Sequence, residues 1–348
     1  MFIGVLMTVA QLNTSAHSKL IIPRTSMAFD RYKKETPHAV RGQEVTGTFT
    51  QIRDVWLKWK KEINDYNASS IDYDAAVSAL QGIRISPRDV ERFCVLLIDH
   101  QEEESWFRSG LFISAMINSS SDSDFTISTK HFSKQIRDLG YRNTKNLTIK
   151  NDGGISLSSV GDYAVSGAIK INGIVMSVGS SMSGGRIIVD GSVRFFLGPE
   201  MSGGSIIIHG NVGRGIHDSS GNIGSHMKGG TILVFGNAHA NVGSYMQGGI
   251  IKIHQNVTDS IGLSMENGII IVKGNAEAVV GLEMNGGFIS IVGNGGRSFS
   301  ASVGYNMHGG EIRVEGDEIY IDDSRSMKIF GRIYHKGRLI FPKESDVK

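Results

Sequence analysis

One seven-residue motif, GxxMx[GN]G, recurs through the second half of the chain. It reads GSSMSGG at 179, GPEMSGG at 198, GSHMKGG at 224, GSYMQGG at 243, GLSMENG at 262, GLEMNGG at 281 and GYNMHGG at 304. A degenerate copy, GDYAVSG, precedes them at 161–167. The copies follow one another at a period of about 19 residues with two longer intervals, and a fixed period of this length is typical of a solenoid. The repeat therefore argues against a phosphate-binding glycine loop, which a single copy would suggest.

Aliphatic residues occupy the same two positions after every copy. Two residues after the closing glycine stand Ile187, Ile206, Ile232, Ile251, Ile270, Ile289 and Ile312, and four after it stand Val189, Ile208, Val234, Ile253, Val272, Ile291 and Val314. The residues between them vary in polarity, and this alternation predicts a short strand with one buried face. The period is too short for two antiparallel strands, so successive copies must stack in parallel. We predict a parallel β-helix of about eight rungs over residues 144–340, followed by a tail at 341–348.

Further columns complete each rung. An aliphatic residue precedes every copy, and the motif methionines are expected to fill an irregular corner of the core with their flexible thioethers. These methionines are Met182, Met201, Met227, Met246, Met265, Met284 and Met307. The glycines are expected at corners that need positive φ. An Asn or Asp follows each strand, and stacked side-chain amides there are expected to bond from rung to rung. This last set is Asn211, Asn237, Asn256, Asn275, Asn294 and Asp317.

The two longer intervals are insertions, NVGRGIHDSSGNIG at 211–224 and NGGRSFSASVG at 294–304. Insertions into a solenoid usually form surface loops on a binding face. We therefore take their exposed polar and aromatic residues as the candidates for docking a protein partner. These candidates are Arg214, His217, Asp218, Arg297 and Phe299. The adjacent His and Asp lack a nucleophile in register, which favours docking over catalysis.

The first part of the chain is predicted to be a small helical domain over residues 27–143, preceded by a weakly ordered or over-extended start at 1–26. The segment 49–66 has apolar residues at helical spacing. Ser86 followed by Pro87 predicts an N-cap and first helical position. A last helix is predicted over 128–140, closed by Gly140.

Composition restricts the classes of partner. Lys and Arg number 36 against 34 Asp and Glu, which leaves a formal charge of +2 and little driving force for nucleic-acid binding. The apolar N-terminal stretch is too short to span a bilayer. A single cysteine, Cys94, excludes internal disulfides and multi-cysteine metal sites, and favours a cytoplasmic location with no cofactor.

One acidic stretch, DHQEEES, suggests a metal or acid/base site made of Asp99, His100, Glu102, Glu103 and Glu104. Adjacent residues on a helix point in different directions, so a solvated face is the favoured interpretation. No HExxH, CxxC or GxSxG motif accompanies the stretch. We therefore assign no catalytic, cofactor-binding or metal-binding residue.

The repeat unit resembles the GXGXG family, which includes the C-terminal domain of the glutamate synthase large subunit and the β-helical subunit of formylmethanofuran dehydrogenase. VGSYMQGGIIKIHQN and GGEIRVEGD look most like the formylmethanofuran dehydrogenase version. The resemblance covers about 160–340 and implies a right-handed parallel β-helix. It also implies a scaffold without catalytic residues, packed against the catalytic subunits of an oxidoreductase-like complex.

Three functions remain open at this point. The chain is expected to be a non-catalytic scaffold subunit bound to catalytic protein partners. Alternatively, it is a stand-alone interaction protein whose β-helix serves as a spacer or forms homo-oligomers. The third alternative is an enzyme with a site between the helical domain and the β-helix.

Overall fold

The computed structural model describes residues 39–62, 69–100, 108–130, 132, 135–213, 221–296, 302–322 and 329–342. The chain divides into two compact units, Met1–Gln43 and Glu44–Lys348. Apart from the first residues of one helix, everything described below belongs to the second unit. The expectations for residues 1–26 and for the tail at 343–348 lie outside the described residues.

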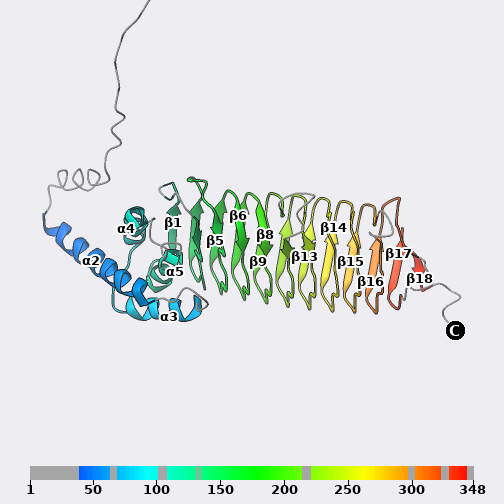
Figure 1. Ribbon diagram of the computed structural model, residues 1–348, viewed down its shortest axis with the longest axis horizontal. Helices are drawn as coiled ribbons and strands as arrows, with labels where there is room; N and C mark the ends of the chain where they lie inside the picture. Colours follow the sequence, from blue (N-terminus) through cyan, green and yellow to red (C-terminus); the bar gives the residue numbers. More distant parts are fainter. Residues whose placement is uncertain are drawn as a thin grey trace, which may run out of the picture. The chain divides into compact units, whose positions relative to one another are not determined.

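The second unit is a β-solenoid of about ten turns of parallel strands with a small group of helices ahead of it, as Figure 1 shows. One side of the solenoid is a twelve-stranded sheet, here called the long sheet. Its strands, in spatial order, are β1 (Asp124–Ser128), β3 (Asn146–Lys150), β5 (Ala168–Asn172), β7 (Arg186–Asp190), β9 (Ser205–Ile208), β11 (Thr231–Val234), β13 (Ile250–Ile253), β14 (Ile269–Val272), β15 (Phe288–Ile291), β16 (Glu311–Val314), β17 (Arg332–His335) and β18 (Arg338–Phe341).

Two smaller sheets form the other sides. A four-stranded sheet contains β6 (Val175–Val178), β8 (Val193–Leu197), β10 (Asn222–Ile223) and β12 (Asn241–Val242), and a two-stranded sheet pairs β2 (Ile136–Arg137) with β4 (Leu157–Ser158). Isolated parallel bridges, such as Val242 to Ile261 and Ile261 to Val280, continue this pairing where no strand is assigned. The predicted parallel stacking is confirmed, and it begins at β1, ahead of the expected start at residue 144.

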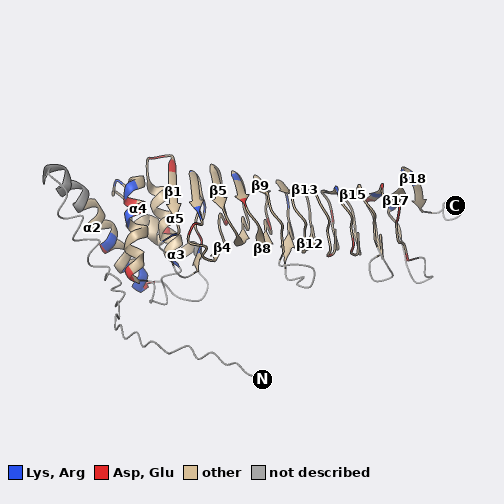
Figure 2. Cartoon of the chain, turned by 90° about the horizontal axis from the view of Figure 1, so that it is seen from above, with Lys and Arg blue, Asp and Glu red and all other residues tan. Residues whose placement is uncertain are grey.

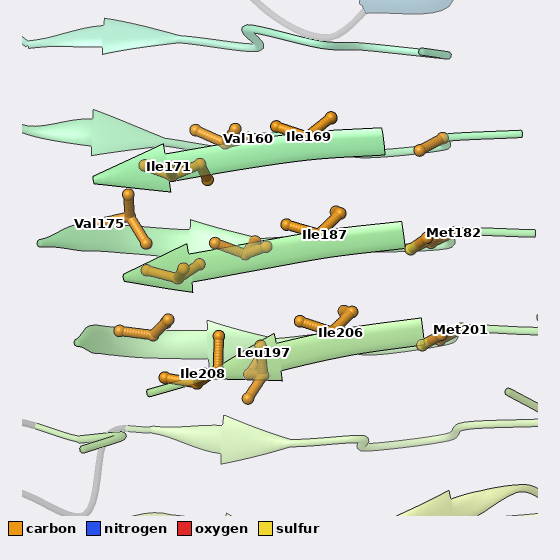
Figure 3. Close-up of a cluster of buried hydrophobic side chains, with 14 of the residues drawn as sticks. Val160, Ile169, Ile171, Val175, Met182, Ile187, Leu197, Met201, Ile206 and Ile208 are labelled. Atoms are coloured by element: carbon orange, nitrogen blue, oxygen red, sulfur yellow. The ribbon is translucent and has the colours of Figure 1, made fainter. Parts of the chain in front are cut away.

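The aliphatic columns form the core of the rod. Ile187 pairs with Ile206 and Ile206 with Ile232, and all three side chains are fully buried. Figure 3 shows the same positions stacked from rung to rung, with Met182 and Met201 in line at the corner. All seven motif methionines are fully buried, which confirms the predicted inward column. Each rung therefore covers the apolar surface of the next.

Two different constraints explain the glycine pair that closes most motif copies. Gly185 has φ of 76°, a conformation that side chains rarely adopt. Gly184 needs room instead, because a Cβ there would lie 2.0 Å from the carbonyl oxygen of Val165 on the preceding rung. The expected positive φ is thus correct for the closing glycine, whereas its neighbour is required by the close spacing of the rungs.

The asparagines after the strands form a hydrogen-bonded ladder, as predicted. Asn211 Oδ1 accepts from the backbone N–H of Asn237 at 2.8 Å, and the pattern repeats along Asn237, Asn256 and Asn275 as far as Asn294. The ladder ends on the N–H of Glu318, 3.2 Å from Asn294 Oδ1. Asp317, which the sequence placed in this column, instead forms an ion pair with Lys336.

Among the described residues, the helical cap consists of α2 (Ala39–Glu62), α3 (Ser69–Ala79), α4 (Pro87–Leu96), the 3₁₀ turn η1 (Leu97–His100) and α5 (Ser109–Ser119). Ser86 caps α4 and forms a capping box with Asp89, which confirms the predicted helix start. Trp56, Phe93 and Phe112 pack together at the centre of the cap. Helix α3 had no counterpart among the expected elements.

The helix predicted over 128–140 is wrong. The described residues of that segment form the end of β1, the strand β2 and a turn. Phe132, Ile136 and Leu139 have helix-like spacing but are buried against the solenoid and the cap. Gly140 does have positive φ, yet it begins a rung corner and does not end a helix.

The far end of the solenoid is closed by a hairpin. β17 adds to the stack in parallel, and β18 then pairs with β17 in the antiparallel sense. This change of direction ends the parallel repeat and covers the open edge of the last rung.

The two neighbouring isoleucines of β13 test the core assignment. Ile251 is fully buried and Ile250 is 39% exposed. We expect Ile251→Ala to lower the free energy of unfolding by about 2–5 kcal/mol, because it leaves a cavity within the stack. Ile250→Ala is the matched control and should cost under about 1 kcal/mol. Urea denaturation followed by circular dichroism measures both, and equal losses would contradict the inward column.

Candidate functional site

The predicted docking residues lie outside the described residues. Arg214, His217 and Asp218 fall in the undescribed segment 214–220, and Arg297 and Phe299 fall in 297–301. Their assignment as partner contacts therefore stays a prediction.

The acidic stretch is described only at its beginning. Asp99 and His100 lie in η1, and the His100 ring packs against the edge of Trp56 with 4.7 Å between ring centroids. Glu102, Glu103 and Glu104 fall in the undescribed segment 101–107. Within the described part of the chain, no group of three or more His, Cys, Asp and Glu side chains could hold a metal ion.

Cys94 is a core residue of α4. Burial raises the pKa of its thiol to about 12, so the thiolate is scarce at neutral pH. This agrees with the interpretation of Cys94 as a small buried hydrophobe.

A polar cavity of about 520 Å³ lies where the cap meets the first rungs of the solenoid. Its charged and aromatic lining consists of Arg137, Asp138, Tyr141, Arg142, Asp162 and Tyr163. Ser70 of α3 and two rung residues, Ser159 and Ser180, add hydroxyl groups. We call this space the cap pocket.

Degenerate copies of the repeat motif build the cap pocket. GYRN at 140–143 and GDYA at 161–164 occupy the corner that GSSM occupies at 179–182. The backbone repeats as well: Gly140 and Arg142 have positive φ, as do Gly161 and Tyr163. The second and third residues of each corner point away from the solenoid core. They are Tyr141 and Arg142 in the first corner and Asp162 and Tyr163 in the next, so the two pairs lie one rung apart. Sequence reasoning missed this site, although the loss of the motif methionine in both copies was a visible signal.

Polar side chains of α5 hold the cap to the first corner. Ser114 Oγ accepts from the N–H of Gly140 at 2.8 Å, and Asn118 Nδ2 donates to the Tyr141 carbonyl at 3.1 Å. Gly110 allows the close approach, since a Cβ there would lie 1.9 Å from the Arg137 carbonyl oxygen. The turn that carries the pocket residues is therefore supported from both the helix and the rung.

Two carboxylates line the cap pocket with raised pKa values. Burial is the main cause for Asp138, and it raises the pKa of that carboxyl to about 6 against the attraction of Arg137 and Arg108. Burial also raises the pKa of Asp162 to about 7, although the Ser180 N–H donates to its Oδ1 at 2.9 Å. The charge of Asp138 adds to the shift at Asp162.

Aromatic rings lie beside these carboxylates. Tyr141 contacts Tyr163 and Tyr73, with ring centroids 5.3 and 5.2 Å away. Burial raises the pKa of Tyr141 to about 12, so its hydroxyl stays protonated. The Arg142 guanidinium lies 5.7 Å from the centre of the Tyr141 ring and donates to Asp74 at 2.8 Å. The pocket thus combines carboxylates that titrate near neutral pH with rings that tolerate a neighbouring cation.

The outer face of the long sheet is a second candidate surface. Outward residues of neighbouring strands form paired rows, with Ile188 opposite Ile207 and Ile269 opposite both Ile250 and Phe288. We call this set the outer stripe: Ile188, Ile207, Leu233, Ile250, Ile269, Ile271 and Phe288. All seven are partly or fully exposed. In Figure 2 most of the strand ribbon is tan, although red and blue segments interrupt several strands, and charged segments are frequent on the helices.

Comparison with protein-family models, with curated proteins and with solved structures finds no match to this chain. Among the described residues, no helix has the length and apolar character that crossing a membrane requires.

Because Asp138 is buried, we expect that replacing its carboxyl group stabilises the protein in a pH-dependent way. In the folded state the pKa of Asp138 is about 6, above the ordinary carboxyl value of 3.8. Ionisation of this carboxyl therefore lowers the free energy of unfolding, and the loss is absent below pH 4 and complete above pH 6. Asp138→Asn keeps the side-chain shape and tolerates the positive φ at this position. We expect the variant to be more stable at pH 8 by on the order of 2–3 kcal/mol, with the gain vanishing towards pH 4.

Asp124→Asn is the control of opposite sign, because hydrogen bonds from Ser123 and Asn146 lower the pKa of Asp124. This variant should not gain stability at pH 8. Urea midpoints at pH 4 and pH 8 measure both effects, and a pH-independent change in Asp138→Asn would contradict the burial of a charged carboxylate.

Proposed function

We propose that the chain is a non-catalytic scaffold whose solenoid binds protein partners along the outer stripe. The outer stripe is the observation that carries the proposal. Ile250 is 39% exposed and Ile269 is 37% exposed, and they stand opposite each other on adjacent strands. Ile250, Ile269 and Phe288 are neighbours on three adjacent strands, whereas Lys252 stands between Leu233 and Ile271 in the second row. An apolar patch with polar residues at its border is typical of protein-interaction surfaces.

The packing of the solenoid supports a structural role. Fully buried columns of Ile, Val and Met side chains fill most of its interior, as expected of a structural core. Parallel hydrogen bonds connect each rung to the next in constant register from β5 to β16. A rod of this kind presents its surface residues at fixed spacing, which suits a rigid docking surface.

The resemblance of the repeat to the GXGXG family supports a particular kind of partner. In that family the β-helix packs against catalytic subunits or domains of an oxidoreductase-like complex. We therefore propose a catalytic protein subunit as the partner of the outer stripe. A second copy of the same chain is the competing occupant, because a stripe of this kind could pair with itself.

Affinity purification of the tagged chain from its native host tests the scaffold. We expect a stoichiometric complex that contains at least one further protein, visible by native mass spectrometry. Recovery of the chain alone at its monomer mass would overturn the proposal. Recovery of a homo-oligomer without another protein would replace the catalytic partner by a second copy.

A pair of substitutions tests the outer stripe itself. Ile269→Lys combined with Ile271→Glu places charges on the stripe without touching the buried Ile270. We expect this variant to lose the partner while its melting temperature changes little, since both side chains point outward. Ile174→Lys is the matched control, because Ile174 is 47% exposed and lies outside the stripe. Retention of the partner by the double variant would exclude the stripe as the docking surface.

A further inference from the structure

We propose that the cap pocket binds an organic ammonium ion, with Asp138 and Asp162 as the counter-ions and Tyr141 and Tyr163 beside the cation. The proposal is independent of the scaffold function. It adds a small-ligand site at the end of the solenoid that carries the helices.

Asp138 is buried without a partner for its carboxylate. This residue is 8% exposed and lines the cavity. No hydrogen bond to either carboxylate oxygen is found among the described residues, although the backbone N–H and carbonyl of Asp138 are both bonded. Buried polar groups are nearly always satisfied, and a buried charge is expensive without a partner. The carboxylate oxygens of Asp138 are not among the fully buried atoms that lack a partner, so they open into the cavity, where a bound ligand can donate to them.

A positively charged donor suits these two carboxylates best. Asp162 lines the same cavity, and the two carboxylates repel each other. A cation between them satisfies both, whereas an anion would add a further repulsion.

The neighbouring arginines do not supply that cation. Arg108 donates to Asp72 at 2.6 Å and Arg142 donates to Asp74 at 2.8 Å. Arg137 lines the cavity and attracts both Asp138 and Asp162, but no hydrogen bond joins it to either pocket carboxylate among the described residues.

An organic cation fits the cap pocket better than a metal ion does. Calcium and similar ions need several oxygen ligands at once, and no described group of three or more suitable side chains exists here. An ammonium group needs fewer, because two carboxylates and nearby hydroxyls can accept its three N–H groups. Ser159 and Ser180 provide such hydroxyls at the wall of the pocket. The paired rings of Tyr141 and Tyr163 add a surface that attracts cations and packs against a hydrocarbon chain.

The size of the cavity is consistent with a small molecule. Its volume of about 520 Å³ lies within the usual range of ligand sites, about 300–1,000 Å³. A free amine and the lysine side chain of a partner peptide share the ammonium chemistry. The experiment therefore includes one arm for each source.

Isothermal titration calorimetry of the full chain tests the proposal, with putrescine as the free amine and acetyl-Gly-Lys-Gly-amide as the lysine source. 1,4-Butanediol is the neutral control, because it has the same four-carbon chain without charge. We expect at least one of the two ammonium compounds to bind at a single site and the diol not to bind. The stronger of the two identifies the source. Absence of binding by both at millimolar concentration would overturn the proposal.

Matched variants localise the site. Asp138→Asn and Asp162→Asn should each weaken binding by at least tenfold, since each removes one counter-ion. Asp317→Asn should leave binding unchanged, because this carboxylate is 93% exposed and lies at the other end of the solenoid. Melting curves recorded beside the titrations show whether each variant is folded, and Asp138→Asn is expected to melt higher than the parent. Equal affinity in Asp138→Asn would show that the amine binds elsewhere.

The pH dependence provides a separate readout. Simple alkylammonium groups stay protonated up to about pH 10, so any change between pH 5.5 and pH 8 comes from the protein. The groups facing the carboxylates are Arg137, Arg142, Tyr141 and Tyr163 of the pocket, with Arg108 and its partner Asp72 behind them. Within this range Asp138 and Asp162 lose their protons. We expect affinity to rise at least tenfold from pH 5.5 to pH 8. An affinity that falls with pH would contradict binding by these carboxylates.

Discussion

The in-register stacking of identical apolar positions is the interaction on which the rest of this structure depends. A single rung buries little surface by itself, but Ile206 lies between Ile187 and Ile232, and its neighbours exclude water from both sides. The hydrophobic gain is therefore shared between rungs and cannot be assigned to one of them. Constant register also aligns the corners. For that reason a glycine such as Gly184 is needed wherever two rungs approach closely, and asparagine amides can bond along one line.

Deviations from the repeat are concentrated where the stack meets the helices. The motif methionine is replaced by Asn143 and Ala164 in the first two corners, and Asn143 is nevertheless buried, with its Nδ2 donating to the carbonyl of Lys145. The end of a solenoid must be covered, and here the helices are held over it by hydrogen bonds from Ser114 and Asn118. The same departure from uniform packing leaves room for the cap pocket. The regular rungs and the polar pocket are thus two results of one architecture.

Much of the rod could be predicted from the sequence because each position repeats. The columns of Ile187 and Met182, the asparagine ladder and the N-cap at Ser86 all depend on local spacing or on a period that is visible in the letters. The helix predicted over 128–140 failed for a physical reason. Phe132, Ile136 and Leu139 have helical spacing, but burial against the solenoid is available to an extended segment as well, and tertiary packing overrides a weak local preference.

The sequence by itself determined the period, the inward columns and the faces that remain outside, since alternation and glycine spacing constrain the backbone of every rung. Only the tertiary structure decided which carboxylates share a cavity. Asp138 and Asp162 belong to different rungs, and each is an ordinary polar residue in its own segment. Parallel stacking brings them to one corner, and α3 contributes Ser70 to the wall beside them. Burial in that corner then raises both pKa values, and burial is a property of the assembled rungs and helices that no local stretch of sequence contains.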